Sequence, residues 1–225
     1  MKATTNDAML NQLMTATLNR RRMLMNAGIA TAALTASVTL GKVSAQMDST
    51  PEAMTEEAPF ASPVDVLNYA LTLEHLEAAF YRDGLAMIGA EGIAALGFAE
   101  AVFENLTVIG EHEAEHVAVL TQVITDLGGE PVAEAMYDFG YTDAAGFLAT
   151  AQALEDTGVA AYQGAAQYAM ASDELLTAAL TIHGVEARHA SYVALLNGAV
   201  PFPESFNPTL TPAEVLDIAT PFIVG

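Results

Sequence analysis

Four segments of the chain carry glutamate and histidine in a repeated order. The first segment has a single glutamate, the second has a Glu-x-x-His sequence, and the third and fourth repeat this order. The six residues of the pattern are Glu74, Glu113, His116, Glu155, Glu186 and His189. On an α-helix, positions three apart lie about 60° apart around the axis, so each Glu-x-x-His pair shares a face.

These residue types in this order favour a centre for two metal ions. Four carboxylates and two imidazoles turned into one interior would be costly without cations, because buried carboxylates repel and lose their hydration. Two divalent cations would balance the four negative charges, and oxygen with nitrogen donors suits iron or manganese. We expect Glu113 and Glu186 to bridge two ions about 3.5–4 Å apart, with Glu74 and Glu155 terminal and open positions for dioxygen or peroxide.

A tyrosine follows each single glutamate at the same spacing. Tyr81 lies seven residues after Glu74, and Tyr162 lies seven residues after Glu155. Positions seven apart nearly coincide on a helix, so Tyr81 and Tyr162 are predicted to hydrogen-bond carboxylates around the metal ligands. The segments LEHLEAAFY and LEDTGVAAY match, as do EAEH and EARH. The chain is therefore interpreted as a duplicated helical hairpin.

Other acidic and histidine residues close to the pattern leave alternatives open. Glu77 is one turn from Glu74 and could replace it as a ligand, although the Tyr81 spacing and the match with Glu155 favour Glu74. Three further histidines, expected beside the centre or on the surface rather than as ligands, are His75, His112 and His183.

His112, Glu113 and His116 also match the His-Glu-x-x-His sequence of zinc hydrolases, in which the histidines bind zinc and the glutamate is the base. The longer form of that motif has glycine and histidine where this chain has Val119 and Gln122. A zinc hydrolase would also leave the other four polar positions without a role, so the dinuclear centre is favoured.

Helical segments are expected to position these residues. Ser62 and Pro63 are typical of a helix start, and we expect this first helix to end at Asp83-Gly84. Further helices are predicted over 98–127, 143–170 and 172–197, with a short last helix beginning at the capping box of Thr211 to Glu214. No segment alternates as a strand does. The prediction is an all-α four-helix bundle over 62–198, with a long crossover and a 199–225 tail that contains the short C-terminal helix.

Composition excludes several functions. The chain has 225 residues, with 7 Lys and Arg against 28 Asp and Glu, and a formal net charge of -21. An excess of acidic residues gives phosphates nothing to neutralise them, so no nucleic-acid partner is expected. Hydrophobic residues make up 52% of the chain, which is too many for a disordered protein. The absence of cysteine excludes disulfides and thiolate metal sites.

The first 45 residues differ from the rest and predict an export signal. Arg20, Arg21 and Arg22 precede an uncharged stretch, and Val43-Ser44-Ala45 provides small residues for cleavage. The paired arginines resemble a twin-arginine signal, which implies a periplasmic or extracellular protein. The apolar stretch is shorter than a bilayer span, so no stable membrane insertion is expected after the signal is removed. Residues 46–61 are interpreted as an acidic flexible linker.

The order Glu, Glu-x-x-His, Glu, Glu-x-x-His resembles the ferritin-like superfamily of di-iron carboxylate proteins. Residues 74–81 are similar to the first helix of bacterioferritins and ferritins, 113–116 to the second, and 154–155 to the third. The signal and the segment ALTLEHLEAAFYRDGL are closer to exported ferritin-like proteins related to plant desiccation proteins.

This resemblance implies that the six residues of the pattern bind two iron ions and that the protein oxidises Fe(II) or handles peroxide or oxygen. The alternatives are a dimanganese catalase on the same scaffold and a non-enzymatic stress or metal-sequestering protein. The resemblance also allows a homo-oligomer. The crossover is shorter than in cage-forming ferritins and the tail is interrupted by proline, so a hollow storage shell is not implied.

Overall fold

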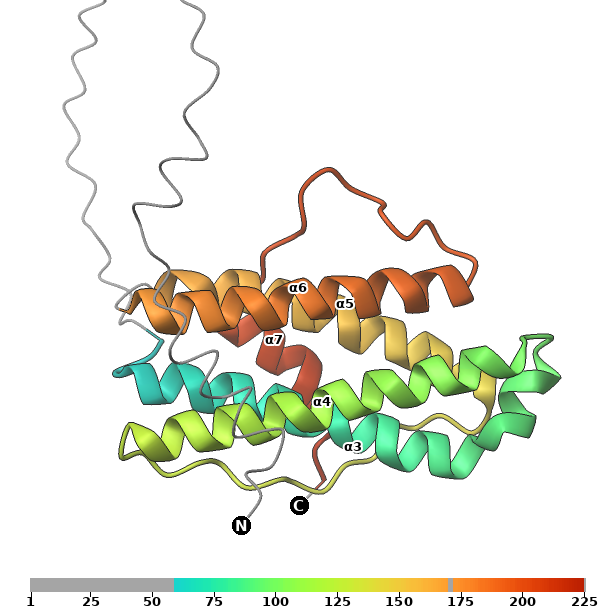
Figure 1. The fold of residues 1–225 in the computed structure, drawn as a ribbon, viewed down its shortest axis with the longest axis horizontal. Coiled ribbons are helices and arrows are strands. Elements are labelled where there is room, and N and C mark those ends of the chain that lie inside the picture. Colours follow the sequence, from blue (N-terminus) through green and yellow to red (C-terminus); the bar gives the residue numbers. More distant parts are fainter. Residues whose placement is uncertain (1–58, 170–171, 225) are drawn as a thin grey trace, which may run out of the picture. The chain divides into compact units, whose positions relative to one another are not determined.

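Four long helices lie side by side in the computed structural model, which describes residues 59–169 and 172–224 (Figure 1). They are α3 (Pro63–Ala95), α4 (Glu100–Asp126), α5 (Ala144–Ala169) and α6 (Asp173–Leu196). The short helix α7 (Pro212–Ala219) and the 3-10 helix η1 (Thr220–Phe222) follow. The predicted all-α four-helix bundle is therefore confirmed for the described residues. The predicted export signal and most of the predicted linker lie outside those residues.

The first helix is longer than predicted. The expected end at Asp83-Gly84 is wrong, because α3 continues to Ala95. Gly84 is a packing glycine inside the helix, since a Cβ placed on it would lie 2.5 Å from both the Phe147 ring and the Tyr141 hydroxyl. The helical path is interrupted only at Gly89, whose φ of 66° and ψ of 171° lie in a region that glycine tolerates.

The other helix limits agree with the sequence to within about two residues. Ser62 caps α3 by accepting the Asp65 amide, and Ser172 caps α6 by accepting the Leu175 amide. Thr211 and Glu214 form the predicted capping box of α7, with each side chain bonded to the backbone amide of the other residue.

The long crossover makes α4 and α5 parallel. Helices α3 and α4 form one antiparallel hairpin and α5 and α6 form the other, while residues 127–143 run along the bundle between them (Figure 1). Asn68 of α3 anchors this crossover through its side chain, which accepts the Val132 amide at 2.7 Å and donates to the Glu130 carbonyl at 3.0 Å. His75 adds a contact of 3.1 Å between its Nε2 atom and the Val132 carbonyl.

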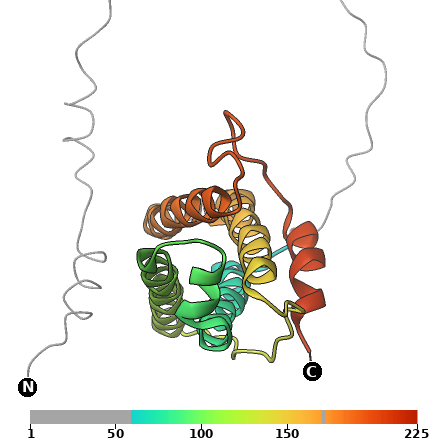
Figure 2. The ribbon, with the colours of Figure 1, turned by 90° about the vertical axis from the view of Figure 1, so that its right-hand side faces the viewer.

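The C-terminal segment closes one side of the bundle. Helix α7 packs outside the four helices, beside α5 (Figure 2), and Val215 of α7 is fully buried. Met136 and Asp138 of the crossover pair with the last residues through two backbone hydrogen bonds, at 2.8 and 2.9 Å. Among the described residues, no helix is both long and apolar enough to cross a membrane.

Candidate metal centre

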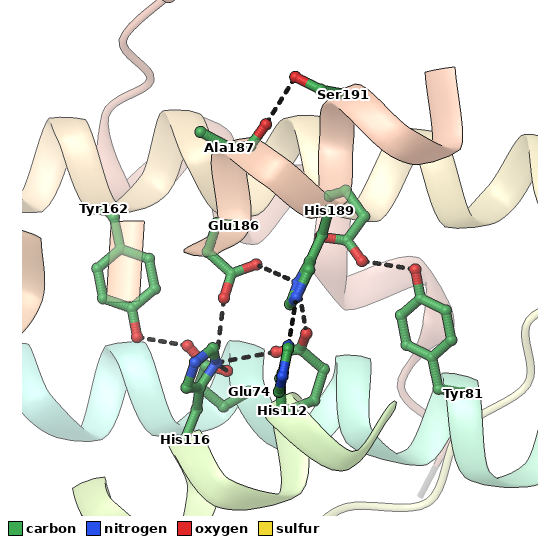
Figure 3. A network of polar contacts seen from close by, with 11 residues as sticks. Glu74, Tyr81, His112, His116, Tyr162, Glu186, Ala187, His189 and Ser191 are labelled. Atoms are coloured by element: carbon green, nitrogen blue, oxygen red, sulfur yellow. Dashed lines mark hydrogen bonds and ion pairs between the residues drawn. The ribbon is translucent and has the colours of Figure 1, made fainter. Parts of the chain in front are cut away.

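The six residues of the repeated pattern converge in the middle of the bundle. The four glutamates have no exposed surface, and the exposed fractions of His116 and His189 are only 9% and 5%. All four long helices contribute to the cluster. Helices α3 and α5 each contribute one glutamate, and α4 and α6 each contribute a Glu-x-x-His pair. Among them, the side chains of Glu74, His116, Glu186 and His189 point toward one another across the helices (Figure 3).

The ligand atoms form two overlapping groups, each gathered within 4.8 Å. We call the first group the Glu74 position; it contains Glu74, Glu113, His116 and Glu186. We call the second the Glu155 position; it contains Glu113, Glu155, Glu186 and His189. Glu113 and Glu186 belong to both groups. This arrangement is the one expected of two neighbouring cations that share two bridging carboxylates.

Three carboxylates surround a single nitrogen in the Glu74 position. The Nδ1 atom of His116 lies 3.1 Å from Glu74, 3.0 Å from Glu113 and 3.1 Å from Glu186. One imidazole nitrogen carries at most one proton, so it cannot donate to all three oxygens along good lines. A cation in the space that these atoms enclose would satisfy all of them at once.

The Glu155 position is likewise incompletely satisfied by hydrogen bonds. The Nδ1 atom of His189 is 2.8 Å from Glu113 and 3.6 Å from Glu155, but neither approach has hydrogen-bond geometry. The buried atoms of the centre that have no hydrogen-bond partner among the described residues are Glu113 Oε1, Glu155 Oε2, both Glu186 oxygens and His189 Nδ1. Since native proteins rarely leave buried polar atoms unpaired, this donor set fits bound cations.

The two tyrosines hold the terminal carboxylates from opposite sides of the centre (Figure 3). Tyr81 donates to Glu155 Oε1 at 2.5 Å, and Tyr162 donates to Glu74 Oε1. Each tyrosine therefore reaches the glutamate of the other hairpin. Burial raises the pKa of both phenols well above the usual range, so both keep the proton that they donate.

His112 supports His189 from outside the two groups. Its Nδ1 atom lies 2.9 Å from His189 Nε2, and the two rings stack with centroids 5.2 Å apart. A partner on the far nitrogen fixes the ring orientation and directs Nδ1 toward the centre. The sequence placed His112 near the centre but did not predict this contact, because the contact depends on how α4 and α6 are rotated.

The other two histidines have different surroundings. His75 faces the crossover rather than the centre. His183 has a buried Nε2 atom with no hydrogen-bond partner among the described residues, and it belongs to neither ligand group.

Burial and the close packing of the cluster shift the pKa values of its carboxylates and imidazoles. Burial raises the pKa of Glu74 and of Glu155 to about 8. Burial also opposes charge on His116 and His189, but the surrounding carboxylates outweigh it and raise their pKa values to about 12 and 11. Burial opposes ionisation of Glu113 too, yet the two imidazoles lower its pKa to about 2. Near neutral pH, protons kept on Glu74, Glu155, His116 and His189 therefore reduce the negative charge of the cluster.

An apolar cavity of about 60 Å³ lies beside the centre. Side chains of α3, α4, α5 and α6 line it, among them Leu67, Leu120, Ala179 and Ile182. Tyr162, which holds Glu74, forms part of its wall. The cavity therefore places an apolar space against a side chain that touches the cluster.

These features define the class of the protein, a four-helix bundle whose interior carries a carboxylate and imidazole cluster able to hold metal. The family model for the ferritin-like domain matches residues 62–199, which contain all four long helices and all six residues of the pattern. The chain belongs to this ferritin-like family. A search of curated proteins found no match.

Proposed function

We propose that the chain binds two iron ions at this centre and oxidises Fe(II) with dioxygen or peroxide as the electron acceptor. The observation that carries the proposal is the pair of ligand groups that share Glu113 and Glu186, with four fully buried carboxylates whose oxygens are incompletely paired. Carboxylate oxygen with imidazole nitrogen is a donor set suited to iron. Iron bound there would supply the electrons that reduce the oxidant.

Each side chain has a defined part in this proposal. Glu113 and Glu186 lie where they can bridge two ions, while Glu74 and Glu155 each serve one ion. Tyr81 and Tyr162 keep these terminal carboxylates oriented through one oxygen, and the other oxygen belongs to the cluster that would hold the cations. This preorganisation lowers the reorganisation needed as ions bind.

The imidazoles must change protonation when ions bind. His116 and His189 each present Nδ1 to the cluster, and that atom must lose its proton before it can donate an electron pair to a metal. The Nε2 atom of His189 lies 2.9 Å from His112 Nδ1, so a proton kept on that nitrogen when a metal binds at Nδ1 would have an acceptor in place.

The apolar cavity beside Tyr162 supports dioxygen as an acceptor, because dioxygen is small and apolar. The proposal further includes export of the chain through the arginine-containing N-terminal segment, as in exported ferritin-like proteins. A mature N-terminus near Gln46, found by mass spectrometry of secreted or periplasmic protein, would support export. An intact N-terminus on protein confined to the cytoplasm would contradict it.

The test of function begins with elemental analysis of protein purified without added metal. Anaerobic Fe(II) titration should then saturate at two ions per chain, and admission of dioxygen or peroxide should oxidise them. Manganese in the purified protein with rapid peroxide decomposition would instead favour a dimanganese catalase. Bound metal without either reaction would favour metal sequestration. If the double substitution of Glu113→Ala and Glu186→Ala left iron binding unchanged, the ligand assignment would be wrong.

A further inference from the structure

A seventh polar side chain, Glu77, is buried beside the six residues of the centre. Its exposed fraction is 3%, and within the described part of the chain its carboxylate has no hydrogen-bond or ion-pair partner. It belongs to neither ligand group. A buried carboxylate without partners is costly, so this residue needs a reason other than packing.

The space that Glu77 occupies is provided by a glycine on the facing helix. A Cβ placed on Gly158 of α5 would lie 3.0 Å from Glu77 Oε1, which is closer than nearly all real contacts of this kind. Gly158 is also the residue that corresponds to Glu77 when LEHLEAAFY is matched to LEDTGVAAY. One hairpin therefore carries a carboxylate where the other carries no side chain at all.

Glu77 lies on the side of the Glu155 position. The same point on Gly158 is 3.7 Å from Glu186 Oε2, so Glu77 and Glu186 approach α5 at one place. Gly158 itself follows Glu155 by three residues, on the same face of α5. Burial first, and the neighbouring carboxylates second, raise the pKa of Glu77 well above the usual range.

The two histidines of the centre also differ in their supporting contacts, and the histidine with the additional contact belongs to the Glu155 position. His189 of the Glu155 position has its far nitrogen bonded to His112. Among the described residues, the far nitrogen of His116 in the Glu74 position has no such partner. A fixed far nitrogen strengthens a histidine ligand.

We propose that Glu77 is an additional carboxylate ligand of the Glu155 position, and that this position binds a divalent cation before the Glu74 position and more tightly. The inference rests on the proposed dinuclear centre and adds an order of loading to it. Four protein ligands from the group and a fifth from Glu77 would surround the first ion, whereas the second would have four.

Stepwise titration of the metal-free full chain with Co(II) under argon tests the inference. Calorimetry gives the two dissociation constants, and the visible absorption of Co(II) reports its coordination number. The wild-type chain should bind two ions in two separate steps. Glu77→Gln should still bind two, but the first dissociation constant should rise roughly tenfold to a hundredfold, because a direct ligand matters at least as much as the groups that support it. The first-equivalent spectrum should shift to a lower coordination number.

Two control variants separate this role from a general disturbance. Glu74→Gln, one turn away on the same helix, should weaken the second step and leave the first unchanged. Glu104→Gln removes an exposed carboxylate of α4 and should leave both steps unchanged. Circular dichroism and thermal melts of the metal-free variants establish that each is folded. If Glu77→Gln does not fold, Gly158→Ala replaces it, since its Cβ would lie 3.0 Å from Glu77 Oε1, so the carboxylate must shift by a few tenths of an ångström, which should weaken the first step.

The inference is overturned if a folded Glu77→Gln or Gly158→Ala chain keeps the wild-type first dissociation constant and first-equivalent spectrum. It is equally overturned if Glu74→Gln weakens the first step. Failure of the proposed dinuclear centre gives a different result, because the wild-type chain would then bind fewer than two Co(II) ions.

Discussion

Replacement of Glu186 by leucine should stabilise the metal-free protein and abolish its metal centre. Glu186 is fully buried and neither of its oxygens has a hydrogen-bond partner among the described residues. An unsatisfied buried polar group costs about 1–3 kcal/mol, and leucine of similar size removes that cost while keeping the space filled. His116 retains Glu74 and Glu113 as neighbours, so the substitution does not leave its imidazole without a carboxylate.

The expected gain is about 2 kcal/mol in the free energy of unfolding, which corresponds to a rise in Tm of roughly 4–8 °C for a domain of this size. The order of the two melting temperatures reverses when metal is present. A ligand at 100 times its Kd stabilises the folded state by about 2.7 kcal/mol for each site, and only the wild-type chain gains this for two ions. Wild type should therefore melt above Glu186→Leu when Mn(II) is in excess.

Thermal melts of both chains, with chelator and with Mn(II), measure this crossing. Glu104→Leu serves as the matched control, because Glu104 is exposed on α4 and its replacement should change stability by less than about 0.5 kcal/mol. If Glu186→Leu melted below wild type in chelator, the carboxylate would be satisfied without a cation. The argument that the interior is built around metal would then fail.

Three further predictions concern protons, histidine support and helix packing. Without metal, the pKa of Glu74 and of Glu155 is about 8 in the folded chain and near 4.5 in the unfolded chain, so folding takes up protons between these pH values. The free energy of unfolding should therefore fall as pH rises from 4.5 to about 8. Urea melts at several pH values measure this, and a rise would contradict it. His112→Ala should weaken Mn(II) binding roughly tenfold to a hundredfold by calorimetry without changing the fold, and an unchanged affinity would mean that the ring contact has no role in binding. Gly84→Ala should lower stability by about 1–3 kcal/mol in thermal melts because its methyl group has no room, whereas Gly184→Ala, with nothing within 4 Å, should not; equal effects would refute the packing argument.

Helical spacing was sufficient to predict the bundle and to bring the six residues of the pattern to one place. Positions three and seven apart fix a shared face whatever the neighbouring helices do, which is why Glu113 with His116 lie together and why Tyr81 lies in line with Glu74. The tyrosines, however, cross to the glutamates of the opposite hairpin, and spacing within one helix carries no information about that choice.

Features that depend on how helices face one another were not predictable. Asp83-Gly84 has the local composition of a helix end, but Gly84 is required by the Phe147 ring of another helix. Glu74 and Glu77 are one turn apart and both buried, so periodicity alone could not separate a group member from its neighbour. The contact between His112 and His189 likewise depends on the relative rotation of two helices.

The two hairpins are similar in sequence but differ at Glu77 and Gly158, and this difference has a consequence for the symmetry of the cluster. An assembly of two identical hairpins around a two-fold axis would have to repeat every side chain, so a carboxylate at the Glu77 position would appear twice or not at all. A second glutamate side chain at Gly158 would crowd the first, because even a Cβ there lies 3.0 Å from Glu77 Oε1. Non-identical halves, which here belong to one chain, remove that symmetry and give the cluster two chemically distinct ends.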